Sequence, residues 1–274
     1  AKNLKFCKTD ILKYKPDALI LVDYPGFNLR IAEFAKEHGI KVHYYISPQV
    51  WAWKQSRVKK IRRDVDKLYC ILPFEKEFYK GHNYDVEFVG HPLIDAIQND
   101  VSKGNLKEEL GIGDKKIAAL LPGSRKQEIS KMLKLMVTMK GHLEDYELVI
   151  AGAPSQDIAF YKNLVGDQVI IIHNRTYDLL READIAMVTS GTATLETALF
   201  KVPEVVCYKG SWMSYQIAKR LVKVDYISLV NLIMNEELVK ELIQGDFNEE
   251  NLKLEIRKIL PGSEGHTKMI EGYS

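Results

Sequence analysis

Two segments place a glycine turn between an apolar run and a helix-forming stretch, a pattern that can bind phosphate. Residues 117–121 run into P-G-S-R-K-Q-E at 122–128, and residues 185–189 run into S-G-T-A-T-L-E at 190–196. A helix that begins directly after such a turn presents free backbone N–H groups, which attract anions. We interpret both segments as candidate anion-binding turns. The alternative is an ordinary capped helix start, with Ser124 as the cap.

The side chains of these turns indicate a nucleoside diphosphate. Arg125 adds a fork of guanidinium donors that suits a phosphate group. Ser190, Gly191 and Thr192 form the second turn. Glu196 lies one helical turn after Thr192 on the same face, where it can accept hydrogen bonds from ribose hydroxyls. The alternative is that Arg125 is solvated and Glu196 only complements the helix dipole. Neither segment is a P-loop or a G-x-G-x-x-G fingerprint.

An acid occupies the end of the first apolar run. Asp23 directly follows residues 18–22 and precedes Y-P-G-F-N at 24–28. A carboxylate at a strand end can act as general base on a hydroxyl group. The alternative is an Asx turn that leads into the Pro-Gly pair.

A tryptophan pair precedes a strongly basic stretch. Residues 54–67 hold seven cations and two acids, a net charge of +5, whereas the whole chain carries only +2. Aromatic residues beside a basic helix are typical of segments that contact anionic membrane headgroups. The candidate contact residues are Trp51, Trp53, Arg57, Lys60 and Arg63. The alternative is a solvated helix face beside core tryptophans.

Composition excludes several classes of function. With 39 Lys and Arg against 37 Asp and Glu, the chain lacks the positive excess of a nucleic-acid binder. Asp64 and Asp66 form a D-x-D pair among cations, which we interpret as ion pairs, so neither a metal nor another cofactor is predicted. The three cysteines form no C-x-x-C pair and indicate reduced thiols in a cytoplasmic compartment. No apolar run reaches the ~20 residues of a membrane span.

The order of elements predicts an α/β fold with two units. Helical stretches separate short apolar runs, which are typical of parallel strands covered by helices on both faces. We expect strands at 18–22, 41–46, 67–72, 86–89, 117–121, 147–151, 169–172, 185–189 and 204–208, and a helix at 126–141. After G-H-P at 90–92 and a polar stretch, the pattern starts again. We therefore expect doubly wound domains at 1–92 and 93–274, with ligands at the carboxyl ends of the strands.

Six sequence blocks occur in the order found in a known family. They are V-D-Y-P-G-F-N at 22–28, S-P-Q-V-W-A-W at 47–53, L-P-F-E at 72–75, V-G-H-P at 89–92, L-P-G-S-R at 121–125 and S-G-T-A-T-L-E at 190–196. Together with the stretch 219–232, they resemble the lipid-A-disaccharide synthase family, over residues 16–242. The resemblance implies the GT-B fold, two Rossmann-like domains facing a cleft. The first would be the acceptor and membrane-side domain, and the second the UDP-sugar domain.

The resemblance also implies a reaction. It would be an inverting, metal-independent transfer of 2,3-diacylglucosamine from UDP-2,3-diacylglucosamine to the 6-hydroxyl of 2,3-diacylglucosamine 1-phosphate. The product would be the β-1,6-linked lipid A disaccharide 1-phosphate. Asp23 would be the base or an acceptor-site acid, and Arg125, Glu196 and Asn231 would contact UDP. The enzyme would be peripheral on the inner face of the cytoplasmic membrane, with a homodimer as a further assembly to test.

Two other classes of function remain open at this stage. One is a different GT-B enzyme, either a glycosyltransferase with a soluble substrate or a UDP-sugar epimerase. The other is a non-catalytic, membrane-associated UDP-binding module. The chain opens without Met, and the family's opening strand, its glycine-rich acidic loop and its final helices have no counterpart in the sequence. We therefore expect a fragment.

Overall fold

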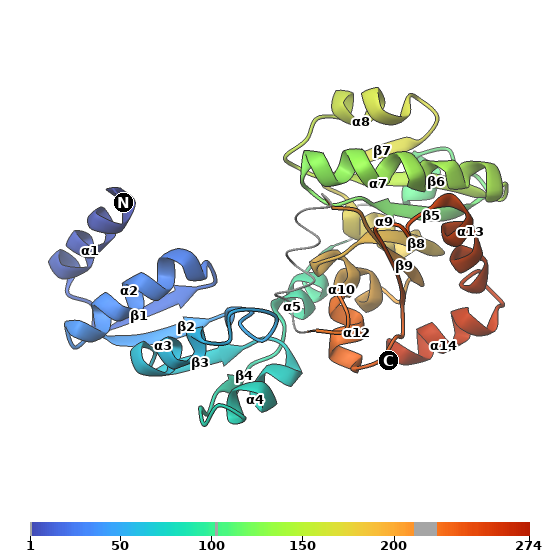
Figure 1. Ribbon diagram of the computed structural model, residues 1–274. Helices are drawn as coiled ribbons and strands as arrows, with labels where there is room; N and C mark the ends of the chain where they lie inside the picture. Colours follow the sequence, from blue (N-terminus) through green and yellow to red (C-terminus); the bar gives the residue numbers. More distant parts are fainter. Residues whose placement is uncertain (1, 102–103, 211–223) are drawn as a thin grey trace. The chain divides into compact units, whose positions relative to one another are not determined.

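The computed structural model describes residues 2–101, 104–210 and 224–274, which form two compact units (Figure 1). One unit holds the described residues up to Asp95 and the other those from Ala96 onward. Helix α5 (Pro92–Gln98) contains the division. Part of the family-like stretch, 219–223, lies outside the described residues.

The first unit is a four-stranded parallel sheet in the order β1-β2-β3-β4 (Figure 1). Its strands are β1 (Ala18–Val22), β2 (Lys41–Tyr45), β3 (Lys67–Cys70) and β4 (Glu87–Phe88), and its helices are α1 (Lys2–Tyr14), α2 (Pro25–Glu37), α3 (Arg57–Asp64) and α4 (Pro73–Lys80). Leu21, Tyr44 and Leu68 point into one core with the helices. On the other face of β1, Ile20 is 73% exposed and Val22 is 51% exposed. The expected cover on both faces is therefore wrong for this edge strand.

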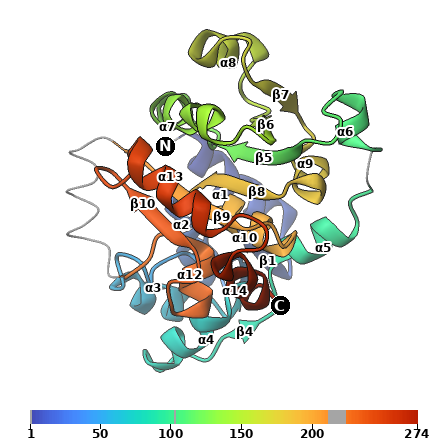
Figure 2. The same cartoon turned by 90° about the vertical axis from the view of Figure 1, so that its right-hand side faces the viewer.

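The second unit is a six-stranded parallel sheet in the order β10-β9-β8-β5-β6-β7, and Figure 2 shows β5, β8 and β9 as neighbours. The strands are β5 (Lys116–Leu121), β6 (Tyr146–Gly152), β7 (Ile170–His173), β8 (Ile185–Thr189), β9 (Glu204–Tyr208) and β10 (Lys240–Ile243). The helices are α6 (Leu106–Glu109), α7 (Lys126–Thr138), η1 (Met139–His142), α8 (Ile158–Val165), α9 (Thr176–Glu182), α10 (Thr192–Leu199), α12 (Leu229–Met234), α13 (Glu249–Lys258) and α14 (Glu264–Gly272).

Helices cover both faces of the central strands in this second sheet. In β5, Ala118 and Leu120 join the core that contains α7 and α13. Ile117 and Ala119 join the opposite core with α9. This alternation follows from the period of two along a strand. The expectation of a doubly covered parallel sheet is confirmed for β5.

The expected strands agree with the observed ones to within two residues at each end. The expected helix at 126–141 is α7 followed by the short 3₁₀ helix η1. The sequence pattern did not predict β10, because its residues K-E-L-I carry charges at an edge of the sheet. Because all strands within each sheet are parallel, their carboxyl ends share one edge. Asp23 follows β1 at the edge of the first sheet, and the two glycine turns follow β5 and β8 at the edge of the second.

Candidate functional site

A pocket of about 450 Å³ lies at the carboxyl edge of the second sheet. Its walls are the ends of β5, β6 and β8 and the starts of α7, α9 and α10. The lining residues are 121, 123–125, 128, 151–154, 176, 189–193 and 196. Because β5 and β8 are hydrogen-bonded neighbours, both glycine turns open into this one pocket.

The starts of α7 and α10 differ from five other helices of the unit in how they are capped. Helices α6, α8, α12, α13 and α14 begin with an Asn, Asp or Ser side chain that accepts a hydrogen bond from the first turn. Helices α7 and α10 begin after Arg125 and Gly191 with no side-chain cap. The alternative of a helix capped by Ser124 is therefore wrong. The first N–H groups of both helices therefore have no side-chain acceptor, and Thr192 and Ala193 of α10 line the pocket, where an anion can accept from them.

The two glycines of these turns allow the backbone to approach a ligand. Gly123 has φ +92°, and a Cβ atom built there would lie 3.0 Å from Cγ2 of Thr189. Gly191 has φ +130°. Other residues rarely adopt such angles. The turns therefore depend on glycine for their shape.

Glu196 is the acid of the pocket. It is half-buried, and its Oε1 accepts a hydrogen bond of 3.0 Å from the hydroxyl of Tyr177. Burial raises the pKa of Glu196, and the Tyr177 hydroxyl opposes that rise. Burial beside this carboxylate raises the pKa of Tyr177 to about 12, so the phenol stays a donor at neutral pH. A carboxylate oriented in this way can accept hydrogen bonds from a vicinal diol.

Arg125 and Ser190 line the pocket, and the side chain of each already donates a hydrogen bond within the protein. The Arg125 side chain is 79% exposed, and its guanidinium donates to Oε1 of Glu128 at 2.9 Å. Glu128 also lines the pocket, so an anion must compete with this carboxylate for Arg125. The Ser190 hydroxyl donates to the carbonyl of Ile227 at 2.8 Å. Its oxygen remains an acceptor, and the bond ties the turn to the segment before α12.

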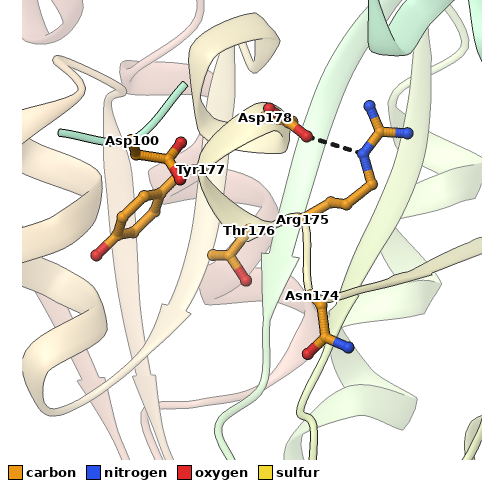
Figure 3. A pocket seen from close by; sticks show the side chains of 6 residues that line it. All are labelled: Asp100, Asn174, Arg175, Thr176, Tyr177 and Asp178. Carbon is orange, nitrogen blue, oxygen red and sulfur yellow. Dashed lines mark hydrogen bonds and ion pairs between the residues drawn. The ribbon is translucent and has the colours of Figure 1, made fainter. Parts of the chain in front are cut away.

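A smaller pocket of about 200 Å³ surrounds the start of α9 (Figure 3). Its lining residues are Asp100 and Asn174 to Asp178, and it shares Thr176 with the larger pocket. Figure 3 shows the side chains of Arg175 and Tyr177 pointing away from each other, with Arg175 bonded to Asp178. This turn was not predicted from the sequence, because H-N-R-T-Y-D at 173–178 contains no glycine. Its position after an apolar strand was the available signal.

Asn231 lies inside the protein rather than in the pocket wall. It is fully buried. Its Oδ1 accepts hydrogen bonds from the N–H groups of Leu238 and Val239, both at 2.9 Å. Its Nδ2 donates to the Val239 carbonyl at 2.8 Å and to Glu241 at 3.0 Å. These four bonds use the whole amide, so the expected direct contact of Asn231 with UDP is corrected to a role in holding α12 against β10.

In the first unit, Asp23 has an exposed carboxylate in an unusual backbone turn. Asp23 and Tyr24 both have positive φ, 44° and 45°. The Asn28 amide donates to the carbonyls of Val22 and Asp23 at 2.9 and 2.8 Å. The Tyr44 hydroxyl donates to the Asp23 carbonyl at 2.5 Å. Left-handed backbone in consecutive non-glycine residues is disfavoured and concentrates at functional sites.

The two tryptophans of the basic segment have different environments. Trp51 is only 7% exposed, and its indole N–H donates to Glu75 at 3.2 Å. Its expected membrane contact is therefore wrong, because the ring belongs to the core. Trp53 is 42% exposed, with the Lys54 ammonium 4.1 Å and the Arg57 guanidinium 5.6 Å from its ring centre. Trp53 and Arg57 thus remain at the surface.

Lys60 and Arg63, the other expected membrane contacts, are ion-paired. Both bond to Glu33 of α2 at 2.7 Å, and Arg63 also bonds to Asp64 at 2.6 Å. The pairing draws them toward α2 and offsets their charge. Their membrane contact stays a prediction, and the ion pairs leave less of their charge for it.

Other expectations concern metals, thiols and membrane spans. Asp64 pairs with Arg63 and Asp66 pairs with Lys36, as interpreted from the sequence. Cys70 and Cys207 are buried free thiols, whereas Cys7 is only half-buried. Within the part of the chain that the structure describes, no helix is both long and apolar enough to span a membrane.

Solved structures with the same architecture define the class of protein. The UDP-GlcNAc 2-epimerase from Neisseria meningitidis, solved with UDP-GlcNAc bound, matches with a TM-score of 0.70 at 12% identity, over 99% of this chain and 76% of that one. Such a likeness shows the fold. The two parallel α/β units and this likeness show the GT-B fold, so the expected fold class is confirmed.

Sequence relatives identify the family. Residues 2–270 match the family described as lipid-A-disaccharide synthetase. The lipid-A-disaccharide synthase of Trichlorobacter lovleyi is 40% identical over 96% of this chain and 71% of its own length, and that of Syntrophus aciditrophicus is 43% identical over 90% and 67%. The chain belongs to the lipid-A-disaccharide synthase family and spans about two thirds of these relatives. It is a glycosyltransferase of lipid A disaccharide synthesis, which confirms the resemblance.

Proposed function

We propose that this chain transfers 2,3-diacylglucosamine from UDP to the 6-hydroxyl of 2,3-diacylglucosamine 1-phosphate. The products are the β-1,6-linked lipid A disaccharide 1-phosphate and UDP. Family membership supports the reaction. The observation that carries the placement of UDP is the pair of uncapped helix starts, α7 and α10, which open into one pocket beside a half-buried acid.

UDP occupies this pocket through its charge and its ribose. The diphosphate accepts hydrogen bonds from the first N–H groups of α7 and α10, and Arg125 turns from Glu128 toward it. The Glu196 carboxylate accepts hydrogen bonds from the ribose hydroxyl groups. Negative charge grows on the diphosphate as its bond to the sugar breaks, and fixed donors stabilise that charge without needing to reorganise. The residues of the pocket thus favour the departure of UDP.

Asp23 accepts the proton of the attacking hydroxyl. As the 6-oxygen of the acceptor bonds to the anomeric carbon, its proton passes to the Asp23 carboxylate, and UDP leaves with the electrons of the broken C–O bond. One displacement of this kind inverts the anomeric configuration. The exposed carboxylate on a backbone fixed by Asn28 and Tyr44 supports this role.

Both substrates are diacylated, so the enzyme works as a peripheral protein at the inner face of the cytoplasmic membrane. Trp53, with Lys54 and Arg57 beside its ring, supports a membrane contact in the first unit. Indole rings prefer the boundary between water and acyl chains. A homodimer is a further assembly, which sedimentation-velocity ultracentrifugation of the enzyme without vesicles would detect.

Calorimetric titration with UDP tests the site. Glu196→Ala should weaken UDP binding by at least about tenfold, because hydrogen bonds to a charged acceptor are lost. Glu250→Ala removes an exposed acid from the first turn of α13, a side-chain-capped helix, and should leave the affinity unchanged. Equal UDP affinity in the two variants, or no UDP binding by the unmodified chain, would refute the proposed site.

A further inference from the structure

Helix α3 carries two sets of cations that differ in their partners. Lys60 and Arg63 pair with Glu33. Lys59 and Arg62 each lie one position earlier, on a neighbouring face. Both are exposed, and neither has an ion pair among the described residues. Apart from Arg57, whose guanidinium lies over the Trp53 ring, the charge that α3 offers to a partner therefore comes from the face of Lys59 and Arg62.

These two cations line a pocket of about 250 Å³ between α3 and the turn after α4, which we term the α3 pocket. It is lined by Gln55, Ser56, Val58, Lys59, Arg62 and His82, none of them acidic. The Arg62 guanidinium donates to the carbonyl of His82 at 3.3 Å, and the His82 ring packs edge-on against Phe78 at 4.9 Å. One bond holds the guanidinium at the pocket while its remaining N–H groups stay available.

The lining suits a phosphate group. A guanidinium, an ammonium, a hydroxyl and an amide all donate hydrogen bonds, and no carboxylate in the wall competes for the two cations. This differs from the UDP pocket, where Glu128 holds Arg125. One water molecule takes about 30 Å³ in the liquid, so the pocket volume of about 250 Å³ is larger than a phosphate group needs. The remaining volume can hold the carbons of a headgroup.

The neighbouring surface points to a lipid as the source of the phosphate. The exposed indole of Trp53 lies just before α3 in the chain, with Lys54 and Arg57 on its ring. An exposed indole in the segment that leads into the α3 pocket is typical of a membrane-binding surface, because indole rings prefer the level of the lipid headgroups. A lipid surface can engage both the indole and the pocket, whereas inorganic phosphate can engage only the pocket.

We propose that the α3 pocket binds the phosphate headgroup of an anionic membrane phospholipid and thereby holds the first unit on the bilayer. The inference rests on the proposed function in one respect, namely that the substrates are membrane lipids. It adds a lipid site separate from the UDP pocket, which belongs to the other unit. Lys59 and Arg62 supply its affinity.

Vesicle co-sedimentation of the whole chain tests the proposal. The vesicles contain phosphatidylcholine alone, or phosphatidylcholine with phosphatidylglycerol in a molar ratio of about 3 to 1. Lys59→Gln with Arg62→Gln should weaken binding to the anionic vesicles by about 20-fold or more, since each cation at the surface contributes about fivefold. Binding to neutral vesicles should be weak for the parent and the variant alike.

A matched control separates a pocket from diffuse charge. Lys60→Gln with Arg63→Gln removes the same net charge from the same helix but leaves the α3 pocket intact. This variant should retain binding within about fivefold of the parent. Equal losses in the two double variants would overturn the pocket, because they would show that only net charge matters.

Free phosphate distinguishes the source of the ligand. Inorganic phosphate should displace the chain from anionic vesicles only at millimolar concentration. Micromolar binding of phosphate to the α3 pocket, with vesicle binding unchanged in Lys59→Gln/Arg62→Gln, would overturn the assignment to a lipid. UDP titrations of the same variants should match the parent. If neither the parent nor either double variant binds UDP, that result would count against the proposed function. The vesicle experiment would still test the α3 pocket, because it does not depend on UDP binding.

Discussion

Asp23 keeps an exposed carboxylate because its neighbours form the turn. The Asn28 amide donates to two successive carbonyls, and the Tyr44 hydroxyl donates to one of them. These two side chains therefore hold the turn, which the Asp23 carboxylate would hold in an Asx turn. The Asp23 carboxylate has no hydrogen bond or ion pair among the described residues. Spacing alone left the two roles of Asp23 open, because it does not show which polar side chain of D-Y-P-G-F-N closes the turn.

Tyr177 positions the acid of the UDP pocket, and its loss should change the pH dependence of binding. The Tyr177 hydroxyl stabilises the charged form of Glu196, so Tyr177→Phe should raise the pKa of this carboxyl further. Because ribose binding needs the carboxylate, UDP affinity falls as pH falls through the pKa of Glu196. In Tyr177→Phe, that fall should begin at a higher pH than in the parent, as measured by calorimetry.

Glu196→Gln is the control for this titration. It has no carboxyl at this position, so its affinity should follow only the protonation of UDP itself. An unchanged pH profile in Tyr177→Phe, at a stability equal to the parent, would show that the tyrosine merely fills space against Phe200, whose ring centre lies 5.2 Å away.

At the scale of elements, the site arises from strand order. The turns after β5 and β8 lie 67 residues apart at Gly123 and Ser190 but come together because the two strands pair in the sheet. Apolar runs and glycine turns predicted both strand ends, and parallel pairing placed them at one edge. Two elements were not predicted, because their sequences lack an apolar run or a glycine turn. Strand β10 has charged residues, and the turn before α9 has no glycine.

Asn231 shows how a residue can matter at a site without touching the ligand. Its amide pairs the buried N–H groups of Leu238 and Val239. Asn231→Ala would leave both unpaired, at a cost of about 1–3 kcal/mol each. We therefore expect urea titration to show a free energy of unfolding lower by about 3 kcal/mol. Asn3→Ala, on the exposed face of α1, should change it little.

The same variant distinguishes the two roles of Asn231. In the absence of urea, where Asn231→Ala remains folded, its UDP affinity should stay within about threefold of the parent, since a lost ligand bond would cost more. A parent-like unfolding curve combined with a large loss of UDP affinity would restore Asn231 as a direct ligand. The Ser190 to Ile227 bond is the route by which a loosened α12 could reach the pocket.

Over the whole chain, positive and negative charges nearly balance, but they are distributed unevenly along it. The basic segment 54–67 stands out in sequence, but Glu33 of α2 neutralises part of it. Partners on another helix cannot be foreseen from local composition, so the sequence does not separate Lys60 and Arg63 from Lys59 and Arg62. Fold class and family were predictable because they rest on long patterns and ordered motifs. The pairing of Lys60 and Arg63 with Glu33 was not predictable, because Glu33 lies on another helix.

Turnover of UDP-2,3-diacylglucosamine with its acceptor, measured for the parent and Asp23→Asn alongside UDP affinity, tests the central claim most directly. Asparagine keeps the shape and turn-forming ability of aspartate but does not accept the proton. Asp23→Asn should lower turnover by at least about 100-fold, the usual contribution of a general base, while UDP binds as tightly as before. Parent-like turnover in Asp23→Asn would contradict the account, because the proton of the acceptor hydroxyl would then go elsewhere.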